Sequence, residues 1–248
     1  SDMFNGALAF KGKILGWTLN STTFLTSMFQ GATAFQRTYG VKDTPSVSNF
    51  GQPAQLLLTY TTTGELVSLP AFKYSGGAAD TAQLHIDWGD GSVHETKTLD
   101  TSDTATPYPH TYTDTGTYVA KIYITTTDPL TQIKTGYHKD IALSKLTSVA
   151  TLYDTSQTWG LANCTDMSYF FETAYTLTSV PDYIPSTVTN MSNMFNGAQA
   201  FNGDIGAWNV SSVTDMTNMF RGATVFNQNI GAWDVSSVTT MSYMFQNA

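Results

Sequence analysis

The sequence has few charged residues, no cluster of basic residues and no long apolar stretch. Only 12% of its 248 residues are charged, with 11 Lys and Arg against 19 Asp and Glu. The net charge of -8 and the lack of any basic run exclude nucleic acid as a partner, because a phosphate backbone requires clustered Lys and Arg. No stretch of about 20 apolar residues is present, so we also expect no membrane insertion within this sequence.

Cysteine and histidine are equally scarce. The single cysteine, Cys164, cannot form an intramolecular disulfide, and we interpret it as a small buried apolar residue. The four histidines are His85, His94, His110 and His138, and no two of them have the i, i+4 spacing of a metal-binding pair. No Ser-His-Asp or Cys-His arrangement can be recognised either. We therefore predict that the chain is not an enzyme and has no catalytic, cofactor-binding or metal-binding residues.

Two carboxylates in the segment LHIDWGDGS come closest to a site. Asp87 and Asp90 flank Trp88 and Gly89, and their side chains suit the capping of a tight turn. A calcium site is the alternative, although calcium takes six to eight oxygens and this loop offers few. We favour turn capping. For His110, we expect a side chain hydrogen-bonded to a neighbouring loop rather than a catalytic group.

What the sequence does contain is a repeat of 25 residues built on a Met-Phe phrase. Repeats of this length predict stacked coils of a solenoid rather than one central core. In each coil, we expect the stretch equivalent to 233–241 to form a short parallel strand and the stretch equivalent to 219–226 to form a short helical turn. The repeated Met, Phe and Trp positions are expected to be core. The copies are MFNGALAF from Met3, MFQGATAF from Met28, MFNGAQAF from Met194, MFRGATVF from Met219 and MFQNA from Met244.

Glycine and asparagine recur at fixed positions of the repeat. Gly197 and Gly222 are expected to permit a tight turn or a close contact between coils, since glycine lacks a side chain and tolerates positive φ. Asn202 and Asn227 follow the phrase in successive copies. We expect their side chains to form a ladder that satisfies backbone groups of the turns.

Between residues 37 and 146 the period disappears and apolar residues alternate with polar ones. The alternation around Tyr118, Ala120 and Ile122 is typical of a strand, and Asp90-Gly91 is a strong tight-turn signal. About seven short strands in about 100 residues indicate a β-sandwich. The fold class is therefore mixed but mostly β. The predicted domains are N-terminal repeats over 1–36, a sandwich over 37–146 and C-terminal repeats over 147–248.

Two phrases in this middle region resemble a known module. WGDGS at 88–92 and HTYTDTGTY at 110–118 resemble the polycystic-kidney-disease (PKD) type of immunoglobulin-like domain. The repeats, in particular MFNGAQAFNGDIGAWNVSSVTDMTNMF at 194–220, resemble the BspA-type leucine-rich-repeat proteins of microbial cell surfaces. Together the resemblances imply an extracellular leucine-rich-repeat-like solenoid interrupted by a PKD-like sandwich. The second repeat departs from the pattern at Thr22, Phe24 and Leu25.

The resemblance to BspA-type proteins implies non-enzymatic adhesion, with a surface protein or a glycan as the partner. A second hypothesis is a self-assembling subunit of an extracellular filament or sheath, formed by head-to-tail stacking of incomplete terminal repeats. A third is a carbohydrate-binding accessory region of a secreted hydrolase. In that case Tyr74, Tyr108 or Tyr137 would stack on sugars.

Four N-glycosylation sequons also occur, at Asn20, Asn163, Asn190 and Asn209. The Ser- and Thr-rich composition explains most of them by chance. They become modification sites only if the source glycosylates its secreted proteins.

Overall fold

The computed structural model describes residues 55–70, 72–73, 83–98, 108–125, 132–133, 143–152 and 164–248. Within these ranges the chain is mostly β and contains no helix, which confirms the prediction of a mostly β class. Residues 54–248 form one compact unit. The predicted repeats of 1–36 lie outside the described residues, and so do His138, Tyr74, Tyr137, Asn20 and Asn163.

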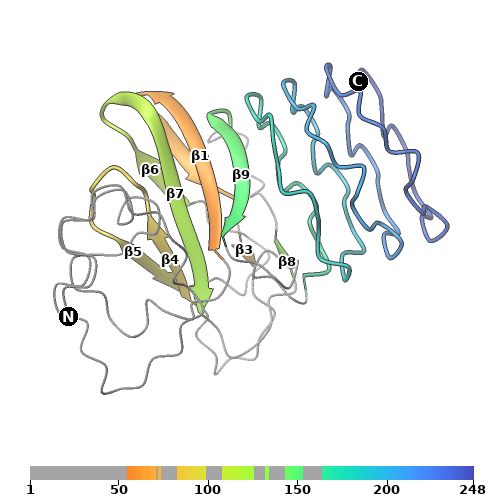
Figure 1. Cartoon of the computed structure of the whole chain (residues 1–248), viewed down its shortest axis with the longest axis horizontal. Coiled ribbons are helices and arrows are strands. Elements are labelled where there is room, and N and C mark those ends of the chain that lie inside the picture. The colour runs from red at the N-terminus through yellow and green to blue at the C-terminus, as the bar shows by residue number, and fades with distance from the viewer. Residues whose placement is uncertain are drawn as a thin grey trace, which may run out of the picture. The chain divides into compact units, whose positions relative to one another are not determined.

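The largest sheet has five antiparallel strands in the order β5-β4-β7-β1-β9 (Figure 1). The period-2 pattern of the sequence explains its inner face, since alternate residues such as Leu58, Leu84 and Ile122 are buried. The strands expected around Ala120 and Ile122 are therefore confirmed. Their bounds are Gln55–Thr63 for β1, Gln83–Asp87 for β4, Glu95–Thr98 for β5, Thr115–Thr125 for β7 and Leu146–Leu152 for β9.

Two smaller antiparallel sheets complete this region. In one, β2 (Leu66–Leu69) pairs with β6 (Tyr108–Thr111), and in the other, β3 (Phe72–Lys73) pairs with β8 (Gln132–Ile133). The buried residues of β2 and β6 belong to the same core as the inner face of the large sheet. A buried hydrogen bond links the two layers, because the Tyr60 hydroxyl donates to the Ser68 carbonyl at 2.8 Å.

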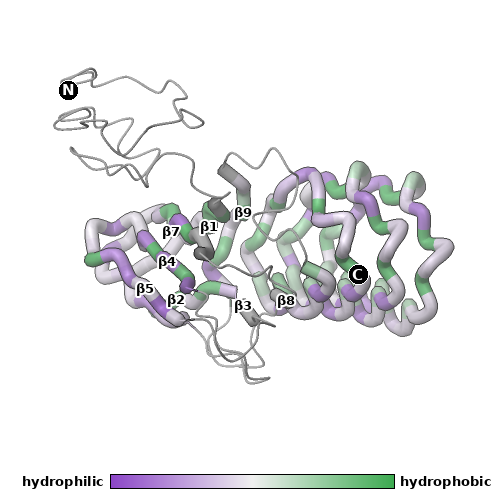
Figure 2. The backbone as a smooth tube through the Cα atoms, turned by 90° about the horizontal axis from the view of Figure 1, so that it is seen from below, coloured by the Kyte–Doolittle hydropathy of each residue, from purple (hydrophilic) through white to green (hydrophobic). Residues whose placement is uncertain are grey.

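Beyond residue 164 the chain forms successive coils that lie side by side (Figure 1). Parallel bridges connect Asp166 to Asn190, Asn190 to Asp215 and Asp215 to Thr240. We use these bridge residues to define coil A (166–189), coil B (190–214), coil C (215–239) and coil D (240–248). Along the tube of these coils, short hydrophobic stretches are interspersed with hydrophilic ones (Figure 2).

The conformation of the Met-Phe phrase corrects the sequence-based prediction. Segment 219–226 is not a short helix: it consists of turns, in which the Met219 and Ala223 N–H groups donate to carbonyls three residues earlier. Between them, Phe220 and Gly222 donate to the Met244 and Gln246 carbonyls of the next coil, each at 2.9 Å, whereas Arg221 donates to the Asn218 carbonyl of its own coil. The strand expected over 233–241 is likewise reduced to a single bridge at Thr240. Neither a helix nor a longer strand forms, because successive N–H groups bond in turn to a carbonyl three residues earlier and to a carbonyl of the next coil.

Residues with a left-handed backbone conformation (positive φ) produce this alternation of hydrogen bonds. Asn218 has φ of 55° and Gly222 has φ of 70°, and coil B repeats the pair with Asn193 at 57° and Gly197 at 75°. Asparagine and glycine adopt this region most readily, and a residue there interrupts any helix. A Cβ on Gly222 would lie 3.7 Å from the Gly197 Cα, so the predicted tight turn and close coil contact are both confirmed.

Aromatic columns form the core of the coils. Phe171, Phe195, Phe220 and Phe245 stack in sequence, with ring centroids 5.4, 5.5 and 5.6 Å apart. The two described indoles of the coils each donate to the preceding coil: Trp208 Nε1 to the Pro181 carbonyl at 2.9 Å and Trp233 Nε1 to the Ile205 carbonyl at 3.1 Å. The predicted burial of the repeated Met and Phe positions is thus confirmed for most inner copies. Cys164 is also buried, as expected.

Polar side chains form ladders beside this core. The hydroxyl of Thr214 donates to the Thr189 carbonyl at 3.1 Å, and that of Thr239 donates to the Thr214 carbonyl at 3.0 Å. The asparagine ladder is confirmed for its described pair, because Asn202 Oδ1 accepts from the Asn227 N–H at 2.9 Å. Both ladders supply partners for backbone groups that no strand or helix satisfies.

Strand β9 joins the large sheet to the coils. One edge of β9 pairs with β1. The other edge meets the coil region through the bridge of Ser148 to Ser179 and the hydrogen bond from the Val149 N–H to the Ser179 carbonyl at 3.0 Å. The sheet therefore continues into the coils across the predicted boundary at 146 and 147, and one buried core spans both regions.

Candidate functional site

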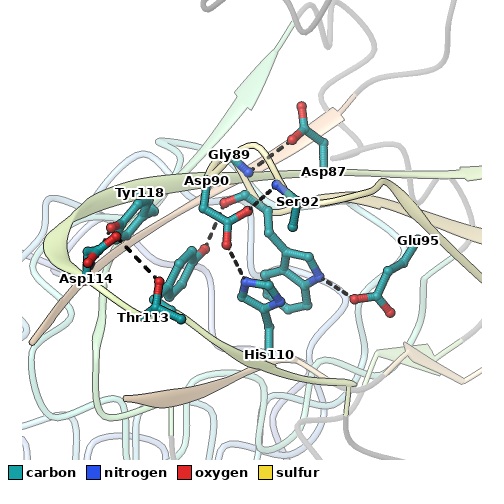
Figure 3. Close-up of polar contacts among 11 residues, drawn as sticks. Asp87, Gly89, Asp90, Ser92, Glu95, His110, Thr113, Asp114 and Tyr118 are labelled. Carbon is teal, nitrogen blue, oxygen red and sulfur yellow. Dashed lines mark hydrogen bonds and ion pairs between the residues drawn. The ribbon is translucent and has the colours of Figure 1, made fainter. Parts of the chain in front are cut away.

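The loop after β4 is the first place where the sequence suggested chemistry. The Asp87 side chain accepts from the Gly89 N–H at 3.0 Å, and the Asp90 side chain accepts from the Ser92 N–H at 2.9 Å (Figure 3). Both bonds close a turn within the loop. The interpretation of these carboxylates as turn caps is confirmed.

The remaining oxygen of Asp87 already has side-chain partners. Its Oδ2 lies 3.4 Å from the Lys121 ammonium and 3.5 Å from His94 Nε2. A calcium ion would compete with that ammonium for the same oxygen. No group of three or more His, Cys, Asp or Glu side chains suited to a metal occurs in the part of the chain that the structure describes.

His110 lies against this loop from β6. Its Nε2 is 2.7 Å from Asp90 Oδ2, and its ring stacks on the Trp88 indole with centroids 4.4 Å apart and planes 11° apart (Figure 3). The side chain is only 12% exposed. The expected bond from His110 to a neighbouring loop is confirmed, and the imidazole is held on both its face and its edge.

Trp88 is the centre of this cluster. It is buried, its Nε1 donates to Glu95 Oε1 at 2.9 Å, and its carbonyl accepts from the Tyr112 hydroxyl at 2.9 Å. Tyr112 in turn stacks on Tyr118 with centroids 4.2 Å apart. Burial raises the pKa of the Tyr112 phenol, which therefore stays a neutral donor.

The two carboxylates of the cluster are ionised at neutral pH. Burial raises the pKa of Asp90, but the hydrogen bonds from Ser92 and His110 outweigh it, so the pKa lies below its ordinary value. The hydrogen bond from Lys97 is the main reason that the pKa of Glu95 is also lowered. A carboxyl group that acts as a general acid at neutral pH needs a raised pKa, not a lowered one. The geometry therefore suits a rigid packing cluster that fixes β4, β6 and β7.

The outer surface of the coils is the second candidate. Its residues vary from coil to coil, although the phenylalanines beneath them are repeated. Next to the repeated phenylalanines, one outer position carries Glu172, Asn196, Arg221 and Gln246 in coils A to D. Glu172 accepts from Asn196 Nδ2 at 3.0 Å, and Arg221 is exposed. We call these four residues the outer column. The sequence analysis did not predict this column. It could have been found as the repeat position that directly follows each repeated phenylalanine and changes in charge from coil to coil.

The remaining predicted site residues are placed as follows. Asn190 of coil B is half-buried and forms bridges to Asp166 of coil A and Asp215 of coil C, and its Oδ1 accepts from the Ser192 N–H at 3.0 Å. Asn209 is exposed, and its Oδ1 accepts from the Ser211 hydroxyl at 2.8 Å. Tyr108 is buried in β6, so its prediction as a sugar-stacking residue is wrong. Its ring packs into the core that β2 and β6 share with the large sheet.

Comparison with known proteins places the repeats in a family. Residues 1–55 and 142–248 match the family described as "Mycoplasma protein of unknown function, DUF285". The match covers well over half of the chain and leaves out most of the antiparallel sheets. No curated protein and no solved structure shows significant similarity to the chain. Over the described ranges, no helix has the length and apolar character needed to cross a membrane.

Proposed function

The chain belongs to this DUF285 family of unknown function, and we propose that it is a non-enzymatic, extracellular repeat protein that binds a protein or glycan at the cell surface. The proposal extends to the finer fold. Coils A to D would belong to a leucine-rich-repeat-like solenoid of the BspA type, and the antiparallel sheets would form a PKD-like sandwich set into it.

The outer column is the observation that carries the proposal. Several buried positions of the coils repeat the same residue, as Phe195 and Phe220 do, because they fill equivalent spaces. The adjacent outer position changes from an acid at the half-buried Glu172 to a base at the exposed Arg221. A regular scaffold that varies only its exterior presents an extended surface for a partner.

The Trp88 cluster supports the same conclusion from the other region. Its polar groups are engaged with one another, as His110 is with Asp90 and Trp88 with Glu95. A cluster of this kind stabilises the sheets and has no polar group set up for catalysis, which agrees with the proposed non-enzymatic role. Nothing in the described residues favours the accessory carbohydrate role, since Tyr108 is buried.

A binding experiment with matched charge variants tests the proposal. The labelled chain is applied to a glycan array and to a panel of immobilised extracellular-matrix proteins. We expect saturable binding to at least one of these surfaces, weakened about tenfold by Arg221→Glu in the outer column. Val93→Glu with Thr98→Glu makes the same total charge change at two exposed positions in and beside β5 and should leave binding unchanged. Equal effects of the two variants, or no saturable binding, would contradict the proposal.

Location is tested separately on intact cells that produce the protein. External protease should remove the protein, and an antibody should label it without permeabilisation. Protection of the protein until the cells are lysed would rule out the extracellular assignment.

A further inference from the structure

Coil B contains the tripeptide Phe-Asn-Gly twice, at 195–197 and at 201–203. An asparagine followed by glycine is open to an internal reaction, in which the glycine nitrogen attacks the side-chain carbonyl carbon of the asparagine and expels ammonia. Glycine favours this reaction because it has no side chain to obstruct the approach. Since the two tripeptides are identical, sequence alone gives both asparagines the same reactivity, and only their surroundings distinguish them.

The first asparagine, Asn196, has both reacting groups engaged. Its Nδ2, the nitrogen that would leave, donates to Glu172 Oε1 at 3.0 Å. The attacking nitrogen is engaged too, because the Gly197 N–H donates to the Arg221 carbonyl at 2.7 Å. This N–H must lose its proton before the nitrogen attacks, so a short hydrogen bond between coils B and C has to break first. The surroundings of Asn196 therefore oppose the reaction.

The second asparagine, Asn202, has its carbonyl oxygen engaged instead. Asn202 is exposed, and its Oδ1 accepts from the Asn227 N–H at 2.9 Å and from Gln228 Nε2 at 3.1 Å. A backbone N–H only donates, so the atom that it meets is the oxygen of the side-chain amide. Negative charge develops on this oxygen when the amide carbon is attacked. Two donors fixed in coil C stabilise that charge.

The attacking and leaving nitrogens of the second tripeptide are not restrained in this way. Over the ranges that the structure describes, neither Asn202 Nδ2 nor the Gly203 N–H has a hydrogen-bond acceptor. The glycine is required by packing, since a Cβ on Gly203 would lie 2.9 Å from Phe201 Cε2 and 3.1 Å from the Thr178 carbonyl oxygen. In coil C, the residue after the ladder asparagine is Gln228, so the reactive pair does not recur there.

We propose that Asn202 is a site of intramolecular deamidation and that Asn196 is protected from the same reaction. The Gly203 nitrogen gives its proton to hydroxide and forms a bond to Asn202 Cγ. The bond from Cγ to Nδ2 breaks, and the side-chain nitrogen takes up a proton and leaves as ammonia. Water then opens the cyclic imide at either of its carbonyls, which leaves an aspartyl or an isoaspartyl residue at position 202. The sum is one water consumed and one ammonia released.

The modification changes the contact between coils B and C. Either product places a new negative charge at position 202, beside the donors of Asn227 and Gln228. The aspartyl product keeps the ladder, because hydrogen bonds to a carboxylate are stronger than those to an amide. The isoaspartyl product adds a methylene group to the main chain and displaces the Asn202 carbonyl, which accepts from Gln228 Nε2 at 2.8 Å. The proposal is independent of the surface partner above, because the reaction needs no ligand.

Peptide mapping by mass spectrometry on the whole chain tests the proposal. The folded chain is incubated at mildly alkaline pH, and the deamidated fraction at positions 196 and 202 is followed over time. We expect position 202 to react at least about tenfold faster than position 196. The same chain in concentrated urea is the control. Unfolding removes the surroundings that distinguish the two tripeptides, so both positions should then react at similar rates.

Two variants assign the effect to the residues named. Asn202→Gln should abolish the fast reaction, because its longer side chain cannot close the same ring. Gln228→Met is similar in length but has no donor, so it should slow the reaction at position 202 about threefold and leave the rates in urea unchanged. Far-ultraviolet circular dichroism checks that both variants are folded. Equal rates at positions 196 and 202 of the folded chain, or a rate at 202 that Gln228→Met does not lower, would overturn the proposal.

Discussion

At the scale of the residue, a few left-handed backbone positions decide how the coils fold. Coils B and C place asparagine and glycine there, at Asn193, Gly197, Asn218 and Gly222. Coil A instead has Thr173 at φ of 59°, in the position equivalent to Gly197. A β-branched residue is unfavourable in this region because its Cβ crowds the backbone. Coil A therefore carries backbone strain at Thr173, and also at Tyr169 with φ of 61°, where coil B has glycine and asparagine.

The first prediction concerns this position. Thr173→Gly should raise the free energy of unfolding by about 1 kcal/mol, since the relief of strain exceeds the entropy that glycine adds to the unfolded chain. Gly197→Ala should lower the free energy by about 1 kcal/mol, because its φ is 75° although a Cβ would meet only ordinary contacts. Urea unfolding measures both. The same sign for the two variants would contradict the explanation.

The second prediction compares two glycines of the loop after β4. A Cβ on Gly89 would lie 2.5 Å from the Val119 carbonyl oxygen, and φ is 76°. We expect Gly89→Ala to cost about 3 kcal/mol or more, because a clash with backbone adds to the strain. Gly91 has φ of 84° but open space around it, so Gly91→Ala should cost only about 1 kcal/mol. Thermal unfolding ranks them, and equal losses would show that the clash relaxes.

At the scale of the element, each coil depends on its neighbours for both its core and its backbone bonds. The column of Phe171, Phe195, Phe220 and Phe245 has similar ring separations throughout. Only an inner ring is covered on both faces. A coil is therefore stabilised in proportion to the neighbours that flank it, as expected for repeat arrays.

The third prediction follows from position in the column. Phe220→Ala should cost about 3 to 5 kcal/mol, because it leaves a cavity between two stacked rings. Phe245→Ala removes the same side chain from a half-exposed site and should cost about 1 kcal/mol. Urea unfolding at about 1 µM, where any association is minimal, provides the comparison. Similar costs would mean that Phe245 is covered in solution.

At the scale of the whole molecule, ionised carboxylates hold segments together that are distant in sequence. Glu65 at the β1–β2 turn accepts from the Thr63 hydroxyl at 2.9 Å, and the same oxygen lies 3.1 Å from the Lys145 ammonium next to β9. Mainly because of these two bonds, the pKa of Glu65 is lowered to about 2. Asp90 links the β4 loop to β6 in the same way, through His110.

The fourth prediction is a loss of stability in acid. A carboxyl whose folded pKa is lowered stabilises the fold above its unfolded pKa, and the effect is lost as pH falls through the folded pKa. For Glu65 the window runs from about pH 4.3 down to about pH 2. The urea midpoint should fall over this window. Glu65→Gln should make the decline shallower, whereas an unchanged slope would mean that the Thr63 and Lys145 contacts do not lower the pKa of Glu65 in solution.

Much of the local structure could be predicted because it depends on nearby residues or on strict periodicity. The alternation around Ala120 and Ile122 specified a strand, and Asp87 and Asp90 specified a capped loop. The repeat period identified the Phe columns, and glycine chemistry identified Gly197 and Gly222. The short helix over 219–226 was a reasonable expectation from spacing, but the spacing could not show that alternate N–H groups bond to the next coil.

The sequence by itself determined the mostly β class, the core positions of the repeat and the turn residues, since each follows from side-chain size, polarity and backbone preference. Only the tertiary structure decided that β9 belongs to both the sheet and the coils and that Tyr108 is buried. These features depend on which distant segments meet. The physical reason is that burial and hydrogen-bond pairing belong to contacts between segments, and no single segment encodes its neighbour.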